Sequence, residues 1–274
     1  LRADGVVRQN NVEQPKFEPL AKDDPESESV ALERLYQATA DDGVINYGPA
    51  FQTVREFWVH DQGAGALVEA GWTAMKFRIG ANRLAGDEAE RARVVRQAVG
   101  PDIALMVDIN QGWTVARTKE VAPLIEPYGL AWLEDPIDHR DIDGYRRLVN
   151  EIGIPITHGE YHFDTEPFAR IAAGRAADVV MIDAHHVGGI VAWLDAAAIC
   201  AGGHLPVATH LSPEIGVHLA AAAPNCQMLE YMDWSVNLFC ERIELDADGR
   251  AIVPERPGLG VTLDDDLVAA RTVS

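Results

Sequence analysis

Seven polar side chains stand where successive apolar runs of this 274-residue chain end. They are Lys76, Asp108, Glu134, Glu160, Asp183, His210 and Glu230. Their separations of 20 to 32 residues leave room for one strand, one helix and the joining loops each time. In a (β/α)8 barrel the catalytic groups come from the carboxyl ends of several different strands. The spacing therefore predicts an α/β fold of the TIM-type barrel class with an active site on its rim.

Three of these residues are carboxylates at the ends of neighbouring predicted strands. Asp108, Glu134 and Glu160 can converge at the mouth of a barrel, and hard oxygen ligands without His or Cys favour Mg²⁺ over zinc. A single carboxylate there would be read as an ordinary loop residue, but three in consecutive repeats favour a metal site. Asn110, two residues after Asp108, is expected to hydrogen-bond near the metal. His158, two residues before Glu160, is expected to be a polar group of the barrel interior.

The flanking strands carry groups suited to proton transfer. Asp183 and His210 end adjacent strands, and a carboxylate bound to one imidazole nitrogen fixes the tautomer and raises the basicity of the other. Lys76 and Arg78 share one face of the strand on the opposite side of the barrel. The pattern predicts a His–Asp dyad that faces a pair of cations across the metal site.

The elements that position these residues follow a regular rhythm. After a first strand predicted at Val44–Tyr47 comes a helix over roughly Thr53–Ala70 that Gly71 would end. Strands are then predicted at 73–79, 104–110, 130–136, 155–160, 178–184, 206–210 and 226–232. The helices between them are predicted at 87–99, 114–126, 142–151, 165–173, 190–201 and 213–222. Ser212 before Pro213 is expected to cap the last of these helices with its hydroxyl.

The three predicted regions are a linker or remnant at 1–40, the barrel at 41–240 and a C-terminal segment at 241–274. Residues 1–29 are polar and rich in charge, which is typical of a linker. In the C-terminal segment, Asp248-Gly249 lies between two short apolar runs and predicts a hairpin turn. The DADG motif there lacks the further ligands of a calcium loop.

The composition of the chain disfavours some classes of binding partner. A formal net charge of −20 disfavours nucleic acid and anionic membranes, both of which need clustered Lys and Arg. No apolar run approaches the roughly 18 residues of a membrane span, and no signal peptide is recognisable. Three cysteines without a CxxC pair indicate neither a disulfide framework nor a zinc knuckle, so a cytoplasmic location is expected. A homo-oligomer is also expected.

The motifs around these strand-end residues resemble the enolase superfamily, and within it the mandelate racemase subgroup. The resemblance covers about 71–263 and rests on GWTAMKFRIG, VDIN, LEDP, HGE, MIDAHHVGGI, THLSPEIGVH, LEYMDW and PERPGLGV. Glu160 as a third metal ligand, and no Lys on the sixth strand, distinguish it from the muconate-lactonising subgroup. The resemblance implies Mg²⁺ on Asp108, Glu134 and Glu160 and removal of a proton α to the carboxylate of a small-molecule substrate. It further implies that Asp183 and His210 form the dyad and that Glu230 donates a hydrogen bond to the substrate carboxylate.

Two departures from the family pattern shape the functional hypotheses. Arg78 replaces a second Lys, and a guanidinium is a poor base. Racemisation needs a base on each face of the α-carbon, whereas loss of a β-hydroxyl can run from one, so dehydration of a sugar acid is favoured. The family's capping domain, which closes the site, is not recognisable in the roughly 40 residues before the barrel. It is expected either on a segment missing from this sequence or on another chain; otherwise the protein is not a competent enzyme.

Two alternatives remain beside the dehydratase. One is a racemase or epimerase of a hydroxy acid on the same scaffold, which would exchange the α-proton without losing water. The other is a catalytically silent barrel kept for assembly or ligand binding. His162, His185 and His186 follow the functional strand ends and are candidates for the substrate pocket, although loop histidines are often simply solvated.

Overall fold

The computed structural model describes residues 28–30, 54–60, 63–68, 73–81, 83–232, 238–246 and 249–271. The elements in chain order are β1 (Glu28–Val30), β2 (Val54–His60), β3 (Gly63–Val68), β4 (Ala74–Arg78), α2 (Ala85–Val99), β5 (Ala104–Asp108), α3 (Val115–Ile125), η2 (Glu126–Tyr128), β6 (Leu130–Glu134), α4 (Ile142–Glu151), β7 (Ile156–His158), α5 (Glu166–Gly174), β8 (Val179–Asp183), α6 (Ile190–Gly202), β9 (Val207–His210), α7 (Pro213–Ala222), β10 (Cys226–Met228) and α8 (Asp265–Arg271). Within these ranges, no helix combines the length and the apolar character needed to cross a bilayer.

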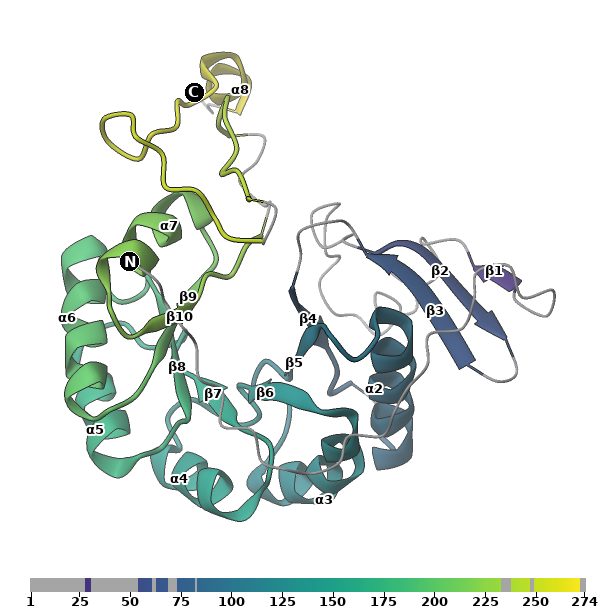
Figure 1. Ribbon diagram of the computed structural model, residues 1–274. Helices are drawn as coiled ribbons and strands as arrows, with labels where there is room; N and C mark the ends of the chain where they lie inside the picture. The colour runs from purple at the N-terminus through teal and green to yellow at the C-terminus, as the bar shows by residue number, and fades with distance from the viewer. Residues whose placement is uncertain are drawn as a thin grey trace.

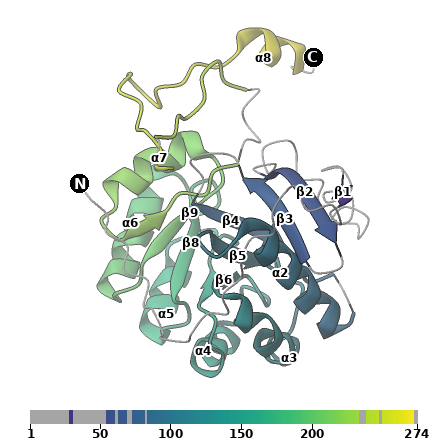
Figure 2. The same ribbon diagram turned by 45° about the vertical axis from the view of Figure 1, so that its right-hand side comes forward.

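A seven-stranded parallel sheet forms the body of the protein. Its strands run in the order β10-β9-β8-β7-β6-β5-β4, which is the order of the chain, and every neighbouring pair is parallel. The sheet curves, and α2 to α7 lie on its outer, convex side (Figures 1 and 2). Successive βα units with a parallel sheet inside and helices outside are the architecture of a TIM-type barrel wall. The fold class predicted from the sequence is therefore confirmed.

Apolar side chains pack on both faces of this sheet. On β5, Leu105 and Val107 join the large core between sheet and helices, while Met106 joins a smaller cluster inside the curve. On β8, Val180 and Ile182 likewise face the helices. Because side chains alternate along a strand, the last residue of β5 and of β8 emerges on the inner face. This alternation is what directs Asp108 and Asp183 toward the inside of the barrel.

A buried arginine ties two loops together at the opposite, amino-terminal end of the strands. Arg96 on α2 is 4% exposed, and burial lowers the pKa of its guanidinium. Among the described residues, its guanidinium donates to the backbone carbonyls of Tyr128, Gly100, Ile103 and Gly129 at 2.7–3.1 Å. Arg96 therefore links the end of α2 to the turn before β6.

The helix predicted over Thr53–Ala70 is wrong. The chain forms two antiparallel strands there, β2 and β3, and β1 pairs with the other side of β2. Val54, Phe57, Trp58 and Val59 are β-branched or aromatic residues, which favour strands, and glycines such as Gly63 weaken a helix. The strand predicted at Val44–Tyr47 and the helix end at Gly71 lie outside the described residues.

The C-terminal segment contains the hairpin that the sequence predicts. Leu245 bridges Ala251 in antiparallel fashion, and the amide of Ile252 donates to the carbonyl of Glu244 at 2.8 Å. Asp248 itself lies outside the described residues. The segment projects beyond α7 and ends in α8 (Figure 1).

Candidate active site

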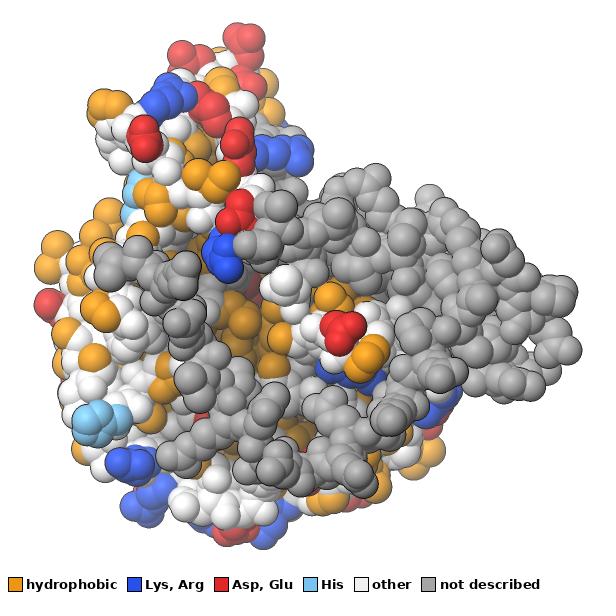
Figure 3. Space-filling view, in the orientation of Figure 1, with side chains coloured by type: hydrophobic (Ala, Val, Ile, Leu, Met, Phe, Trp, Pro, Cys, Tyr) orange, Lys and Arg blue, Asp and Glu red, His pale blue; other side chains and the backbone are white. Residues whose placement is uncertain are grey.

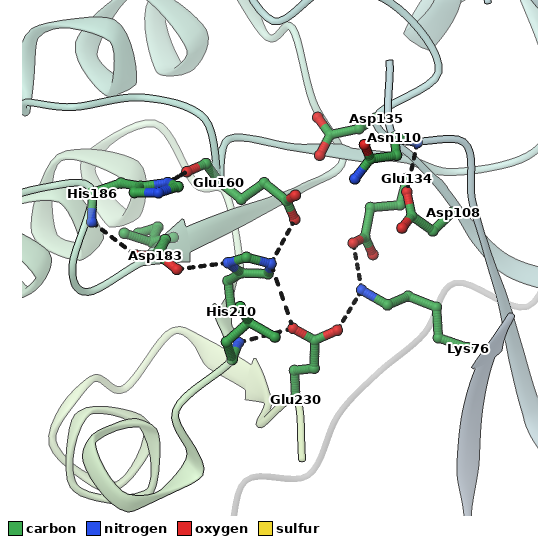
Figure 4. A network of polar contacts seen from close by, with 12 residues as sticks. Lys76, Asp108, Asn110, Glu134, Asp135, Glu160, Asp183, His186, His210 and Glu230 are labelled. Atoms are coloured by element: carbon green, nitrogen blue, oxygen red, sulfur yellow. Dashed lines mark hydrogen bonds and ion pairs between the residues drawn. The ribbon is translucent and has the colours of Figure 1, made fainter. Parts of the chain in front are cut away.

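The functional side chains gather at the carboxyl ends of the parallel strands. Strand register places Arg78, Asp108 and Glu134 in one row across β4, β5 and β6, and it places Asp183 opposite His210 on β8 and β9. Figure 4 shows the side chains of Glu134, Glu160, His210 and Glu230 pointing toward a common centre from separate strands.

A cluster of buried carboxylates forms one half of this centre. Ligand oxygens of Glu134, Asp135 and Glu160 all lie within 4.8 Å of one another, so they could share one metal ion. Asp108 lies outside that group, and its Oδ1 accepts a hydrogen bond from the amide of Asn110 at 2.7 Å. Asp135 was not singled out from the sequence, although a second acidic residue directly after Glu134 in LEDP was a visible signal. The structure thus brings Glu134 and Glu160 together as predicted and adds Asp135 beside them.

Burial dominates the electrostatics of these carboxylates. It raises the pKa of Glu134 to about 7, against the opposing effect of the Lys76 ammonium. Burial, followed by the neighbouring carboxylates, raises the pKa of Asp135 and of Glu160 well above the usual range, and burial also raises that of Asp108. Oδ2 of Asp135 is buried and has no hydrogen-bond partner within the described part of the chain. If all four carboxylates were ionised, their negative charge would exceed the positive charge that Lys76 and Arg78 supply.

Lys76 connects the carboxylate cluster to the last strand. Its Nζ lies 2.5 Å from Glu134 Oε1 and 2.5 Å from Glu230 Oε1. Burial acts to lower the pKa of Lys76, but Glu134 and Glu230 outweigh it and hold the pKa well above its usual value. Arg78 is half-buried on the same face, where its charge acts on Asp108.

Glu230 accepts hydrogen bonds in this arrangement. Its Oε2 accepts from the amide of Leu211 at 2.9 Å, in addition to the Lys76 contact. Burial acts to raise the pKa of Glu230, but Lys76 and His210 together bring it below its usual value. Donation from Glu230 to a substrate carboxylate, which the resemblance implies, would therefore require a proton that these surroundings disfavour.

The other half of the centre is the dyad of Asp183 and His210. Nδ1 of His210 lies 2.6 Å from Asp183 Oδ2, so the ring is held through this nitrogen. Its Nε2 faces the cluster, 3.2 Å from Glu160 Oε2 and 3.9 Å from Glu230 Oε2 (Figure 4). Burial acts to raise the pKa of Asp183, but hydrogen bonds from His210 and from the amide of His186 outweigh it and lower that pKa. An ionised Asp183 suits a histidine that takes up a proton on Nε2.

Left-handed backbone is concentrated in the loops that follow these strands. Positive φ angles between 40° and 63° occur at Asn110, Gln111, Asp135, Leu211 and Ser212. This conformation is strained for non-glycine residues, and strained residues are concentrated at functional sites. Asn110 therefore does not continue the strand, as the sequence suggested, but begins a turn; its described hydrogen bond to Asp108 comes from its backbone amide.

Glu160 reaches the site because Gly159 interrupts the alternation of β7. Gly159 has φ +138°, and a side chain there would collide with the carbonyl oxygen of Met181. His158 shares a face of β7 with Ile156, so alternation directs it to the helix side, where its ring stacks on Tyr145 at 3.6 Å. The prediction that His158 is a polar group of the barrel interior is therefore wrong.

His162 lies in the same layer as His158, away from the carboxylates. It is buried and makes edge contacts with the rings of His158, His139 and Phe168. Burial lowers its pKa to about 4. A role for His162 in substrate binding stays a prediction that this packing does not favour.

His185 and His186 join the loops around the dyad. The amides of both residues donate to Asp183 Oδ1 at 2.7 Å, and His186 Nδ1 lies 2.7 Å from the carbonyl oxygen of Glu160. The exposed ring of His185 is hydrogen-bonded through Nε2 to Ser212 Oγ at 2.9 Å. Ser212 stands at the N-cap of α7, but its hydroxyl makes no capping bond, so the predicted hydroxyl cap is wrong. Its carbonyl accepts the first helical amides instead.

A cavity of about 310 Å³ reaches this centre between β4 and β10. Lys76 and Glu230 form its polar wall, while Met106, Trp132 and Met228 supply apolar surface. In Figure 3, apolar side chains line the hollow at the middle of this face. A small ligand with a charged end and a less polar body would match these walls.

Known proteins are similar to this chain in both sequence and fold. The family model described as enolase C-terminal domain-like matches residues 59–267. L-talarate/galactarate dehydratase from Salmonella typhimurium is 35% identical over 197 residues, which are 72% of this chain and 49% of that protein. Arabinonate dehydratase from Saccharolobus solfataricus is 33% identical over 206 residues, 72% of this chain and 55% of that protein.

A solved structure agrees with these sequence matches. L-talarate dehydratase from a Polaromonas species, crystallised with Mg and L-glucarate, superposes with a TM-score of 0.69 at 36% identity. The match covers 73% of this chain and 56% of that one. The chain thus spans about half the length of the relatives it matches. Because the matched family model covers most of its sequence, the chain belongs to the enolase superfamily, through the enolase C-terminal domain-like family.

Proposed function

We propose that this chain carries the site of a Mg²⁺-dependent acid-sugar dehydratase, a hydro-lyase that converts an aldonate or aldarate to a 2-keto-3-deoxy acid. The observation that carries the proposal is the orientation of His210. Asp183 holds Nδ1 at 2.6 Å, and Nε2 points at the carboxylate cluster. A base held in this way next to a cation site is suited to removing a proton α to a bound carboxylate. The dehydratases similar to this chain support the same choice.

The residues fit a magnesium ion. All candidate ligands are carboxylate oxygens, which Mg²⁺ prefers, and Asp135 Oδ2 is buried without a partner in the described part of the chain. Asp108, Glu134 and Glu160 are the proposed ligands, and Asp135 lies close enough to Glu134 and Glu160 to replace or support Asp108. When bound, Mg²⁺ stabilises the negative charge that develops on the substrate carboxylate as the α-proton leaves. The related Polaromonas enzyme was crystallised with Mg.

His210 carries out both proton transfers in the proposed reaction. Its Nε2 takes the proton from the α-carbon, and the electron pair of that C–H bond moves toward the carboxylate. The pair then forms the double bond between the α- and β-carbons while the β-carbon–oxygen bond breaks. The departing hydroxyl takes the proton from Nε2 and leaves as water, and the enol product tautomerises to the 2-keto acid. Arg78 and Lys76 supply positive charge beside the substrate carboxylate and hydroxyls.

A racemase or epimerase is the second candidate because Lys76 Nζ lies across the site from His210 (Figure 4). An amine there could act as a base on the opposite face of the α-carbon. Two carboxylates at 2.5 Å favour the charged ammonium, however, which has no lone pair to accept a proton. The geometry therefore favours chemistry that uses one base.

Turnover of acid sugars in D₂O tests the proposal. Galactarate, L-talarate and arabinonate would be incubated with the full chain and Mg²⁺, and both product and recovered substrate analysed by NMR. The expected result is a 2-keto-3-deoxy product with recovered substrate unepimerised, and His210→Asn should abolish both product and deuterium uptake. Epimerised substrate without loss of water would favour the racemase instead. Absence of both reactions across a broad panel of acid sugars would contradict the proposal for this chain.

Binding of Mg²⁺ is measured separately by calorimetry. Glu134→Gln and Glu160→Gln should each weaken binding at least about tenfold, since each removes a charged ligand. Comparison of Asp108→Asn with Asp135→Asn identifies the third ligand by the larger loss. Glu120→Gln, on the exposed face of α3, is the control and should bind Mg²⁺ as the wild type does. Unchanged binding in the Glu134 and Glu160 variants would overturn the site.

A further inference from the structure

We propose that His185 is a positioning residue: it closes a clasp between the loops after β8 and β9 and thereby holds His210 in line with Asp183. The role of this clasp in turnover rests on the proposed function. The clasp itself rests on two hydrogen bonds of His185. Its ring therefore binds another residue of the protein, whereas the sequence predicted a contact with substrate.

His185 contacts Asp183 directly, and it contacts the loop that follows His210. Its backbone amide donates to Asp183 Oδ1 at 2.7 Å, which leaves Asp183 Oδ2 to meet His210 Nδ1 at 2.6 Å. Its ring reaches across to the other loop, where Nε2 is hydrogen-bonded to Ser212 Oγ at 2.9 Å. Ser212 is only two residues after His210. One residue therefore holds the carboxylate of Asp183 through its amide and the loop after His210 through its ring.

The backbone after His210 needs such support. Leu211 and Ser212 both adopt left-handed conformations, with φ of 50° and 42°. Two such residues in succession are costly and persist only where surrounding contacts over-determine them. The amide of Leu211 is held by Glu230 Oε2 at 2.9 Å, and the side chain of Ser212 is held by His185. Without the His185 contact, the turn keeps the Leu211 amide bond and the bonds from α7 to the Ser212 carbonyl, but it loses its link to the loop after β8.

The hydroxyl of Ser212 is committed to this contact. Ser212 occupies the N-cap of α7, where a serine hydroxyl ordinarily accepts from the helix, yet it makes no such bond. The first amides of α7 donate to its backbone carbonyl. Because the ring of His185 is exposed, its removal should leave the core intact while it loosens the turn.

The spectroscopic test follows the ring proton of His210. A proton on Nδ1 in a 2.6 Å bond to a carboxylate should give a downfield ¹H signal in protein labelled with ¹⁵N-histidine, assigned by its loss in His210→Asn. His185→Ala and Ser212→Ala should each broaden this signal and speed its exchange with solvent about fivefold or more, because a typical net hydrogen bond corresponds to a factor of that order. The double variant should add little to either single change. His185→Gln, which keeps a side chain able to hydrogen-bond to Ser212, should retain the signal.

The kinetic test separates positioning from binding. With an acid sugar that the wild type turns over, both alanine variants should lose about fivefold in kcat with KM nearly unchanged. His218→Ala is the control, since it removes a histidine contact of 3.0 Å between α7 and the carbonyl of Leu259 in the C-terminal segment, and it should change neither kcat nor the His210 signal. A wild-type His210 signal and exchange rate in both alanine variants would overturn the clasp. A loosened signal in a protein that turns over no acid sugar would support the clasp and reject the proposed function.

Discussion

The His158→Phe variant should be less stable than the wild type near neutral pH and more stable than the wild type in acid. Burial lowers the pKa of His158 to about 3, from an ordinary value of 6.5. The unfolded chain therefore takes up a proton below pH 6.5 that the folded protein does not. Wild-type stability falls by about 1.4 kcal/mol for each pH unit below 6.5, or about 3 kcal/mol at pH 4.5, from this residue alone.

The phenylalanine variant removes this proton uptake and keeps the stacked ring. It should retain the contact with Tyr145, which the wild-type ring makes at 3.6 Å, but lose the hydrogen bond from Nε2 to the carbonyl of Ala176 at 3.1 Å. That loss costs about 1 kcal/mol at every pH. The variant should therefore be about 1 kcal/mol less stable than the wild type at pH 7.5 and about 2 kcal/mol more stable at pH 4.5.

Urea unfolding at four pH values between 4.5 and 7.5 measures this difference, and other titrating groups largely cancel between the two proteins. Ile156→Val is the matched control on the same face of β7, because it removes a buried methylene without a titrating group. Its cost, about 1 kcal/mol, should not depend on pH. A constant difference between His158→Phe and wild type across the range would refute the reasoning.

Two further predictions concern residues that support the barrel and the site. Arg96→Met should destabilise the protein by about 3 kcal/mol or more in urea unfolding, because four backbone carbonyls lose the guanidinium that donates to them, whereas Arg93→Met on the surface of the same helix should cost less than about 1 kcal/mol. Similar costs for the two would contradict the assigned role. Gly159→Ala should weaken Mg²⁺ binding measured by calorimetry and cost about 2 kcal/mol or more, because its side chain would collide with backbone and displace Glu160. Gly174→Ala, with open space around it, is the control, and an equal effect of the two would argue against the turn.

The sequence alone was sufficient for the order of the barrel strands and for the residues that end four of them, Asp108, Glu134, Asp183 and His210. Alternating apolar positions and the helix signals between them are local features, so they can be read without knowledge of the fold. The helix predicted at Ile142–Glu151 has those bounds in the structure. The pairing of Asp183 with His210 also followed from the sequence, because consecutive strands of a parallel barrel are neighbours in space.

Local pattern was least informative where two structures compete for the same segment. The run from Val54 to Val68 has enough apolar residues for a helix, yet it pairs as β2 and β3. Whether a helix or a pair of strands forms there depends on partners elsewhere in the chain. One such partner is β1, which pairs with the edge of β2 that β3 does not occupy.

What only the tertiary structure decided are the directions of side chains just beyond the strands. Period-two alternation ends with the strand, and from there φ angles determine direction: strict alternation would put Glu160 on the helix side with His158, but the backbone at Gly159 turns it inward. The same holds for Asp135, which a left-handed turn brings beside Glu134 and Glu160. It holds as well for Ser212, whose hydroxyl meets His185 of another loop. Such contacts join residues distant in sequence through strained backbone, and that strain is stable only because the packed barrel holds both loops in place.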